Sequence, residues 1–260
     1  MDELLYEVSD PGIAVITIDR PERKNAMTFE MNTQLFALLD RARDDADVRA
    51  AVITGVPGSF CAGTDLSALA DVPAEDRANQ EGDAWSTHEG SMLGFTKPLI
   101  CAVDGPAVGW GAELTSMCDI RIATPNARFA WNFVHRGLVP DAGAGTWLLP
   151  RLIGVQSAMD LLLSGEFLSA DAALQRGYVW KVVQPDELAA TALDTAVRLS
   201  QGSPFAAARV KDLVMRGLGR SWSDHLPIHR GVLEECMQSD DHREGVAAFL
   251  ERRDPHFTGT

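Results

Sequence analysis

The chain has 260 residues, enough to bury a large core as one domain or as one domain with an appendage. Its 46% hydrophobic and 23% charged residues are ordinary for a globular protein. The net charge of −14 argues against a nucleic-acid partner and against an anionic membrane surface. No apolar run has the length of a membrane span, and the acidic start MDELLYEVSD lacks a signal-peptide pattern, so we expect a cytoplasmic protein.

The N-terminal part predicts a hairpin, a helix and a strand in succession. Leu4–Val8 and Ile13–Ile18 are short, β-rich runs that an Asp-Pro-Gly turn can join. Thr28 is a typical N-cap, and apolar side chains recur at helical spacing over Leu35–Ala42. Ala50–Thr54 is the next apolar run and predicts a strand.

The middle of the chain alternates between loops and short elements. Asp71–Phe95 is polar and carries six acids, which predicts an exposed, mobile segment of weak helical character. Leu99–Val103 predicts a buried strand, Gly105–Met117 a glycine-rich corner that leads into a helix, and Ile120–Ala123 another strand.

Further along, Gly137–Gly145 has the composition of a loop. Thr146–Ile153 predicts a helix, although Pro150 strains it. Ala170–Arg176 follows a serine N-cap and predicts a short helix, and Lys181–Val183 predicts a short strand.

From residue 186 onward the pattern is helical only. An apolar stripe runs over Ala189–Val197, and Ser203 is an N-cap followed by proline at the first helical position. Two more helices are expected over Ser223–Met237 and Asp240–Arg252. We therefore predict an α/β protein with a core of strand–strand–helix units over residues 1–203, which holds the active site, and a helical region over residues 204–260.

Cysteines and histidines give no sign of a metal site. The four cysteines are far apart, without CxxC or Cys/His ligand spacing, and are Cys61, Cys101, Cys118 and Cys236. We expect buried free thiols. The six histidines form no HExxH pair, so no metal is expected.

Gly105–Asp119 has the pattern of an anion-binding corner. A strand enters a glycine-rich turn, and a helix begins near Gly109-Trp110-Gly111. The first N–H groups of such a helix lack internal partners and can hold an anion or a developing oxyanion. Glu113 lies near the helix start, where the helix dipole tolerates a carboxylate. The plain alternative is a strand–helix corner with a capping acid.

Ser59–Leu66 also follows an apolar strand and bends at small residues, so the two corners can face each other and each supply one N–H. FCAGTDL followed by KPLICAVDGPAVGWGAEL resembles the enoyl-CoA hydratase/isomerase (crotonase) superfamily. The resemblance covers nearly the whole chain, from the RPERKNAM loop to the HREGVAAFLERRDPHFTG tail. It implies a crotonase-like spiral of ββα units and a C-terminal helical region that packs in trimers. The paired motifs are specific to the superfamily and much less specific to one reaction.

Other common active sites do not fit the sequence. Leu114 stands where a dinucleotide fingerprint has its third glycine. There is no GxxxxGK[ST] phosphate loop and no GxSxG elbow.

The resemblance implies that the backbone N–H groups of Thr64 and Trp110 form an oxyanion hole for a thioester enolate. The indole of Trp110 either narrows the pocket or packs in the core. Glu113 matches the first of two catalytic glutamates in relatives that hydrate enoyl thioesters. The second would lie twenty residues later, where this chain has Phe133. The sequence therefore departs from the pattern of a two-glutamate hydratase.

Asp141 lies in GLVPDAGAGTWLLPRLIG, which resembles the branch that isomerises ring-epoxide and unsaturated acyl-CoAs in phenylacetate breakdown. In that branch an aspartate at this position transfers protons. One carboxylate beside an oxyanion hole suffices to move a proton between the carbons α and γ to a thioester. An apolar neighbour such as Phe133 would raise the pKa of a nearby carboxyl. The alternative is a turn aspartate after proline.

The resemblance also implies coenzyme A as part of the substrate, with no separate cofactor. The residues expected to contact it or the acyl group are Arg23, Lys24, Ala26, Ala62, Gly63, Asp65, Leu66, Gly109 and Phe133. For Ala26 and Ala62–Leu66 the resemblance implies contacts of the backbone with pantetheine and adenine. Solvated surface cations are the alternative for Arg23 and Lys24. Trp131 and His135 either line the acyl pocket or belong to the core. The charge of −14 conflicts mildly with a polyanionic ligand, so local cations or backbone amides would have to offset it.

We therefore expect an acyl-CoA enzyme that shifts a double bond or isomerises a ring, with Asp141 and Glu113 as acid/base carboxylates. Hydration by Glu113 with Asp141 as partner is the second hypothesis. A non-catalytic acyl-CoA binding protein is the third, and the presence of both carboxylates argues against it. We expect a homotrimer or a hexamer.

Overall fold

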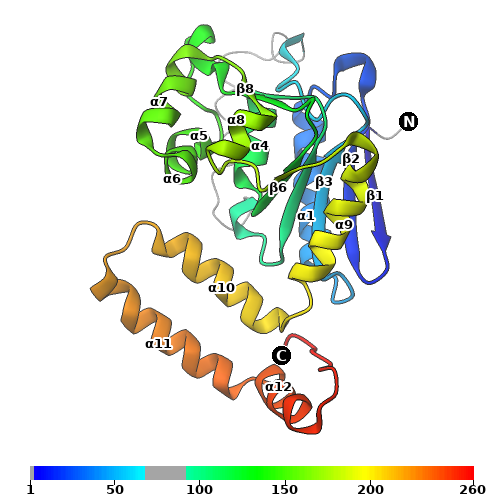
Figure 1. Cartoon of the computed structure of the whole chain (residues 1–260), viewed down its shortest axis with the longest axis vertical. Helices are drawn as coiled ribbons and strands as arrows, with labels where there is room; N and C mark the ends of the chain where they lie inside the picture. The colour runs from blue at the N-terminus through cyan, green and yellow to red at the C-terminus, as the bar shows by residue number, and fades with distance from the viewer. Residues whose placement is uncertain (1–2, 68–91) are drawn as a thin grey trace.

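The computed structural model describes residues 3–67 and 92–260. Its centre is a six-stranded sheet with the order β1-β2-β3-β4-β6-β9 (Figure 1). Its strands are β1 (Leu4–Ser9), β2 (Ile13–Ile18), β3 (Ala50–Gly55), β4 (Leu99–Val103), β6 (Ile120–Ala123) and β9 (Lys181–Val182). Strands β1 and β2 form the expected antiparallel hairpin, and the remaining pairs are parallel.

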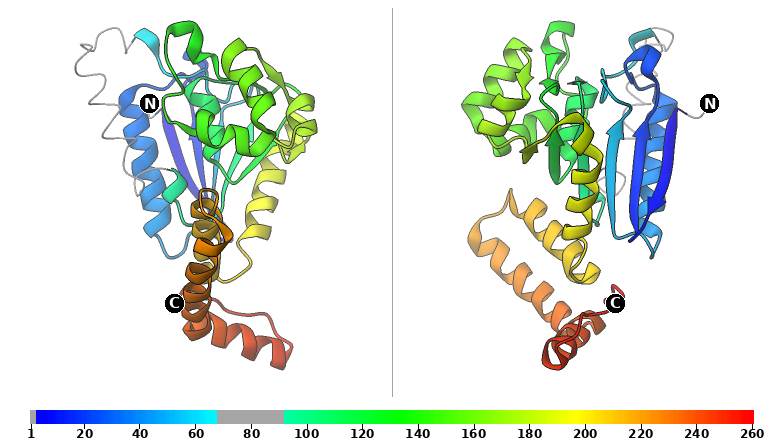
Figure 2. Two further views of the ribbon diagram at one scale, coloured as in Figure 1. Left: turned by 90° about the vertical axis from the view of Figure 1, so that its left-hand side faces the viewer. Right: turned by 45° about the vertical axis from the view of Figure 1, so that its right-hand side comes forward.

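Both faces of this sheet are buried, because a helix covers each of them. Helix α1 (Phe29–Asp44) packs against β1, β2 and β3, whereas α9 (Leu188–Leu199) packs on the opposite face (Figure 2). Alternate side chains of β3 point to opposite faces of the sheet. Ala51 and Ile53 belong to the hydrophobic cluster that includes α1. Ala50 and Val52 belong to the cluster that includes α9. Strands buried on both sides appear in sequence as continuous apolar runs, which explains why they were predictable.

Local capping signals in the sequence are confirmed. Met31 donates its backbone N–H to Thr28 Oγ1 at 3.1 Å and so caps α1. Ser169 caps α8 (Ala170–Gln175), and Ser203 caps α10 (Pro204–Gly217) in the same way. Each side-chain oxygen satisfies one of the first N–H groups of its helix, which favours the start at that residue.

A second, smaller layer lies beside the main sheet and was not expected from the sequence. It is a three-stranded sheet of β5 (Pro106–Val108), β7 (Arg128–Ala130) and β8 (Leu168–Ser169). Strands of two or three residues are too short to show an alternation of apolar and polar residues in the sequence. Next to it, all eight residues of α4 (Trp110–Met117) are buried, which makes this helix the centre of the core.

The region after this sheet corrects two expectations. The single helix predicted over Thr146–Ile153 is two short helices, α5 (Ala144–Trp147) and α6 (Leu149–Ile153). Pro150 lies in the first turn of α6, where its missing N–H costs nothing, so the chain restarts a helix there rather than carrying proline in a helix interior. Helix α7 (Val155–Ser164) was not predicted from the sequence, and it runs between two glycines of positive φ, Gly154 and Gly165.

Three C-terminal helices extend away from the body of the molecule (Figures 1 and 2). They are α10, α11 (Trp222–Gln238) and α12 (Asp240–Glu251), close to the expected bounds. The described 3-10 turns are η1 (Pro21–Arg23), η2 (Met92–Gly94), η3 (Asn132–Arg136) and η4 (Pro185–Glu187).

Some expectations concern residues that the structure does not describe. The acidic segment expected to be mobile, Asp71–Phe95, lies outside the described residues up to position 91. Across residues 3–67 and 92–260, no helix combines the length and apolarity needed to cross a lipid bilayer. The cysteines are free thiols; Cys61, Cys101 and Cys118 are buried and Cys236 is partly exposed.

Candidate active site

The two glycine-rich corners meet, as the sequence indicated. Cys61 donates its N–H to Pro106 O at 3.0 Å, and Val108 donates its N–H to Cys61 O at 2.9 Å. Gly111 makes this approach possible, because a Cβ at that position would overlap the carbonyl oxygen of Cys61. The first turn of α4 therefore packs directly on the backbone of the first corner.

Thr64 and Trp110 lie on facing sides of this contact. Gly63 has φ of +104°, and a Cβ on it would lie 2.9 Å from Val108 O and 3.8 Å from Trp110 N. Thr64 follows directly, and no acceptor among the described residues takes its N–H. Trp110 is the first residue of α4, where helix N–H groups point outward from the helix end.

Both residues line a pocket of about 290 Å³. Its walls come from the two corners, from η3 and from the loop that follows it: Ala62, Gly63, Thr64, Leu66, Val108, Gly109, Trp110, Asn132, Phe133, Arg136, Leu138, Val139, Pro140 and Asp141. The structure thus brings together eight of the residues singled out from the sequence. The other wall residues were missed, because nothing local in the sequence indicates which side chains of a loop turn toward a cavity.

Phe133 and Gly109 form one side of the pocket beside the helix start. Phe133 is buried, and its Cζ would lie 3.9 Å from a Cβ on Gly109, which has φ of +55°. Phe133 is the residue at the sequence position where we expected the second glutamate of a two-glutamate hydratase. The pocket has an apolar wall at this point.

The indole of Trp110 packs in the core, which was one of the two alternatives for it. Its side chain is buried in the main core cluster and lies 6.4 Å from Phe36 between ring centroids, and the residue also lines the pocket. Trp131 is a core residue, packed edge-on against Tyr178 at 5.3 Å. His135 contacts Ser164 O at 2.7 Å and is not among the lining residues, so the structure does not bring either of these two to the pocket.

Asp141 is the acidic side chain on the pocket wall. It follows Pro140 in the loop before α5, and its Oδ1 accepts the N–H of Ala142 at 2.9 Å. Burial is the main cause that raises the pKa of Glu113 and of Cys61, and the negative charge of Asp141 adds to both increases. The carboxylate is therefore near both corners and near the buried glutamate.

Glu113 lies behind the pocket wall rather than on it. Its side chain is completely buried, and neither carboxylate oxygen has a hydrogen bond of good geometry among the described residues. Burial raises the pKa of Glu113 to about 8, and the charge of Asp141 acts in the same direction. The N–H groups of Gly145 and Ala144 and the indole of Trp131 partly oppose this effect. Glu113 is thus held mainly as a neutral acid near pH 7.

Gly145 is the neighbour that fixes this arrangement. A Cβ on it would lie 2.5 Å from Glu113 Oε1 and 3.0 Å from Trp131 Cδ1. A larger residue at this position would therefore press on the carboxyl of Glu113 and on the ring of Trp131.

Four of the expected substrate contacts are outside the pocket. Arg23 and Lys24 are exposed in the loop after β2, although Lys24 O accepts the N–H of Ala62 at 3.0 Å and so adjoins the first corner. Ala26 offers its carbonyl to Arg20, and Asp65 forms an ion pair with Arg20 at 2.8 Å. The side chain of Asp65 is therefore engaged within the protein. The residues that the structure describes contain no cluster of three or more His, Cys, Asp or Glu side chains suited to a metal ion.

Comparison with known proteins gives a consistent result. The sequence pattern of the family Enoyl-CoA hydratase/isomerase matches residues 9–260. The chain belongs to this family.

Members of the family resemble the chain over its full length. It is 37% identical to 1,2-epoxyphenylacetyl-CoA isomerase of Escherichia coli, covering 100% of both chains. It is 40% identical to a probable enoyl-CoA hydratase of Rhodobacter capsulatus, covering 98% of this chain and 97% of the relative. The crystal structure of enoyl-CoA hydratase from Bacillus anthracis superimposes with a TM-score of 0.92 at 29% identity over 100% of both chains. The crotonase fold expected from the sequence is confirmed, and the chain is an enzyme of the hydratase/isomerase type.

Proposed function

We propose that the protein isomerises an acyl-CoA thioester, shifting a double bond or rearranging a ring through an enolate. The observation that carries the proposal is that Asp141 lines the same pocket as Thr64 and Trp110, whereas position 133 is occupied by phenylalanine. The similarity to a protein named 1,2-epoxyphenylacetyl-CoA isomerase supports the same reaction class.

The proposed step begins with the thioester oxygen held by the N–H groups of Thr64 and Trp110. Asp141 removes a proton from the carbon α or γ to the carbonyl, and the electron pair moves onto the thioester oxygen as an enolate. Asp141 then delivers a proton at the other carbon, so the product has the composition of the substrate. While it is on the carboxyl of Asp141, the proton exchanges with solvent. Donors aimed at the oxygen where charge develops are usually the largest single contribution to such a reaction.

Glu113 assists this step from behind the pocket wall by staying neutral. Its raised pKa keeps it protonated near pH 7, so the site carries one negative charge, on Asp141, rather than two. Two adjacent carboxylates repel each other, and a neutral partner avoids that repulsion when the enolate forms.

For the coenzyme A portion, we propose that Arg23 and Lys24 attract the phosphates while the backbone of Ala26 and residues 62–66 contacts pantetheine and adenine. The exposed position of both cations and the hydrogen bond between Lys24 and Ala62 support this proposal. The side chain of Asp65 has no direct part in it, because it is paired with Arg20.

We also propose that the helical region, residues 204–260, packs between subunits in a homotrimer or a pair of trimers, while residues 1–203 hold the active site. Large apolar side chains on these helices are exposed in the single chain, among them Trp222 at 72%, Phe249 at 83% and Leu250 at 74%. Exposed apolar surface of this extent marks an interaction site in soluble proteins.

The reaction is tested by incubating the protein with 2-enoyl, 3-enoyl and dienoyl thioesters in heavy water and following product mass. Incorporated deuterium without the mass of water is the expected result. Gain of water would favour the second candidate, hydration, which the relatives named hydratases support. If every thioester is recovered with its structure and mass unchanged, the protein binds acyl-CoA without catalysing a reaction. Phe133→Glu is a further check: it should increase hydration if the carboxyl of Glu113 can reach a water held at position 133.

A further inference from the structure

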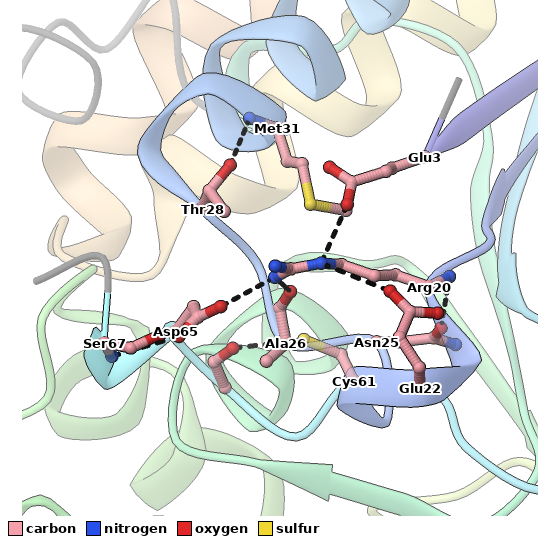
Figure 3. A network of polar contacts seen from close by, with 11 residues as sticks. Glu3, Arg20, Glu22, Asn25, Ala26, Thr28, Met31, Cys61, Asp65 and Ser67 are labelled. Carbon is pink, nitrogen blue, oxygen red and sulfur yellow. Dashed lines mark hydrogen bonds and ion pairs between the residues drawn. The ribbon is translucent and has the colours of Figure 1, made fainter. Parts of the chain in front are cut away.

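A buried ion pair lies immediately behind the first corner, and it has no part in the proposed chemistry. Arg20 Nη1 donates to Ala26 O at 2.9 Å and contacts Asp65 Oδ2 at 2.8 Å (Figure 3). The two side chains are only 13% and 9% exposed. On its other side, Arg20 Nε lies 2.8 Å from Glu3 Oε1, so the guanidinium is held from both directions.

The two partners of Nη1 flank a single backbone bridge. Met27 donates its N–H to Gly63 O at 2.8 Å, and Asp65 donates its N–H to Met27 O at 2.8 Å. Thr64 lies between these two bonds, and its own N–H has no acceptor among the described residues. Arg20 Nη1 thus links Ala26, which precedes Met27, to Asp65, which follows Thr64.

Further contacts keep both ends of this tie in place. Asp65 Oδ1 accepts the N–H and the hydroxyl of Ser67 at 3.0 and 2.5 Å. Asn25 accepts the N–H of Arg20 at 2.8 Å and donates to Ser59 O at 2.7 Å. Hydrogen bonds from Ser67 and Arg20 hold the pKa of Asp65 at about 2, so the ion pair persists throughout the neutral range.

We infer that Arg20 is a positioning residue for the oxyanion hole: through Ala26 and Asp65 it holds the peptide of Thr64 so that its N–H points into the pocket. This inference rests on the proposed function, which requires that N–H as a donor. Arginine suits the task, because its planar guanidinium presents several donors at fixed angles, whereas a lysine ammonium on a flexible stem does not hold two acceptors in a set geometry.

The experiment measures the quality of the oxyanion hole separately from turnover. Acetoacetyl-CoA is the probe, because its enolate absorbs in the near ultraviolet and its enolisation is titrated while bound. The variants are Asp65→Asn, which keeps the shape but removes the charge, and Arg20→Lys, which keeps the charge but alters the donors. Asp119→Asn is the matched control, because Asp119 Oδ2 also accepts one N–H, that of Leu99, and pairs with a cation, Lys211, at 2.8 Å, away from the pocket.

Asp65→Asn should bind about tenfold less of the probe as enolate at a given pH, and kcat for isomerisation should fall by about 10²-fold, as a misplacement of about 1 Å does. For Arg20→Lys, the bound enolate and kcat should both lie between the values of the wild type and those of Asp65→Asn. Affinity for butanoyl-CoA, which carries no enolate, should stay within about threefold of the wild type. Asp119→Asn should have a lower melting temperature than the wild type, but the same amount of bound enolate and the same kcat.

The outcomes separate this inference from the proposed function. If the wild type stabilises the enolate and both variants do so equally well, Arg20 only supports the fold and the inference is wrong. If the wild type itself gives no enolate, the oxyanion hole is wrong and the inference falls with it. A loss of enolate in Asp119→Asn equal to that in Asp65→Asn would also contradict the inference, because it would show a general effect of lower stability.

Discussion

At the scale of single residues, the proposed site contains two acids in different surroundings. Asp141 is on the wall of the pocket, and Glu113 is completely buried behind it. Burial raises the pKa of Glu113, which keeps it a neutral acid near pH 7, whereas Asp141 faces the pocket and is the proposed base.

Asp141→Asn and Glu113→Gln test this division. Asp141→Asn should keep the fold and the binding of coenzyme A, because asparagine preserves the shape of the side chain. It should lower isomerisation by about two to four orders of magnitude, the usual contribution of a positioned acid/base. Glu113→Gln should reduce isomerisation less and any hydration more. Steady-state kinetics on both variants decide the matter: a nearly silent Asp141→Asn with an inactive Glu113→Gln would make Asp141 a turn residue.

Glu113 should also make stability depend on pH. Its pKa is about 8 in the folded chain and about 4.3 when unfolded, so folding takes up a proton between these values. The unfolded state then binds fewer protons, and stability falls as pH rises from about 4 to about 8, then levels off. Glu113→Gln removes this slope. Asp141→Asn reduces it, because the charge of Asp141 helps to raise the pKa of Glu113.

Denaturant unfolding of the wild type and of Glu113→Gln, from about pH 5 to about pH 9, measures the effect. The stability difference between the two should grow with pH in favour of the variant. A difference that stays constant over this range would mean that Glu113 has an ordinary pKa.

At the scale of secondary-structure elements, the pocket depends on how closely the first turn of α4 approaches the first corner. Gly111→Ala places a methyl group against Cys61 O and should push the two corners apart. Overpacking of this kind costs about 1–3 kcal/mol of stability. Because it also separates Thr64 from Trp110, kcat should fall by about 10²-fold.

Gly202→Ala is the control for this change, because nothing lies within 4 Å of a Cβ at Gly202. Its melting temperature and its kcat should match those of the wild type. Full activity in Gly111→Ala would show that the close contact of the two corners does not set the geometry of the hole.

At the scale of the whole molecule, the charge of −14 acts against a polyanionic ligand. We expect free coenzyme A to bind nevertheless, through backbone amides and the local charges of Arg23 and Lys24. Replacing both cations by alanine should weaken binding and flatten its dependence on salt, because fewer charge pairs are screened. Lys181 and Arg198 are exposed cations elsewhere, so their double alanine variant changes the net charge equally. Calorimetric titration should show weakening in the first variant only; equal weakening in both would mean that only the overall field matters.

The C-terminal helices give a prediction about assembly. Phe249 and Leu250 are adjacent, largely exposed apolar side chains on α12. If they pack against another subunit, light scattering should give the mass of three or six chains. The double change Phe249→Glu and Leu250→Glu should shift the mass toward one chain, because a buried, unpaired carboxylate is costly. A dilute monomer that is fully active in the unaltered protein would exclude the assembly.

The sequence by itself determined the elements whose signals are local. Continuous apolar runs such as Leu99–Val103 become strands because both sheet faces are buried, and Thr28, Ser169 and Ser203 start helices because their side chains bond the next turn. The paired corner motifs determined the family and the contact between the corners.

Only the tertiary structure decided which of the candidate residues face the pocket. Glu113 and Asp141 are both acids in glycine-rich stretches, yet Asp141 lies on the wall and Glu113 behind it, because α5 packs over α4 through Gly145. In the same way only the structure shows that the side chain of Asp65 pairs with Arg20, which leaves its backbone as the part expected to contact coenzyme A. Burial and the distances between segments far apart in the chain arise from packing, which no local pattern encodes.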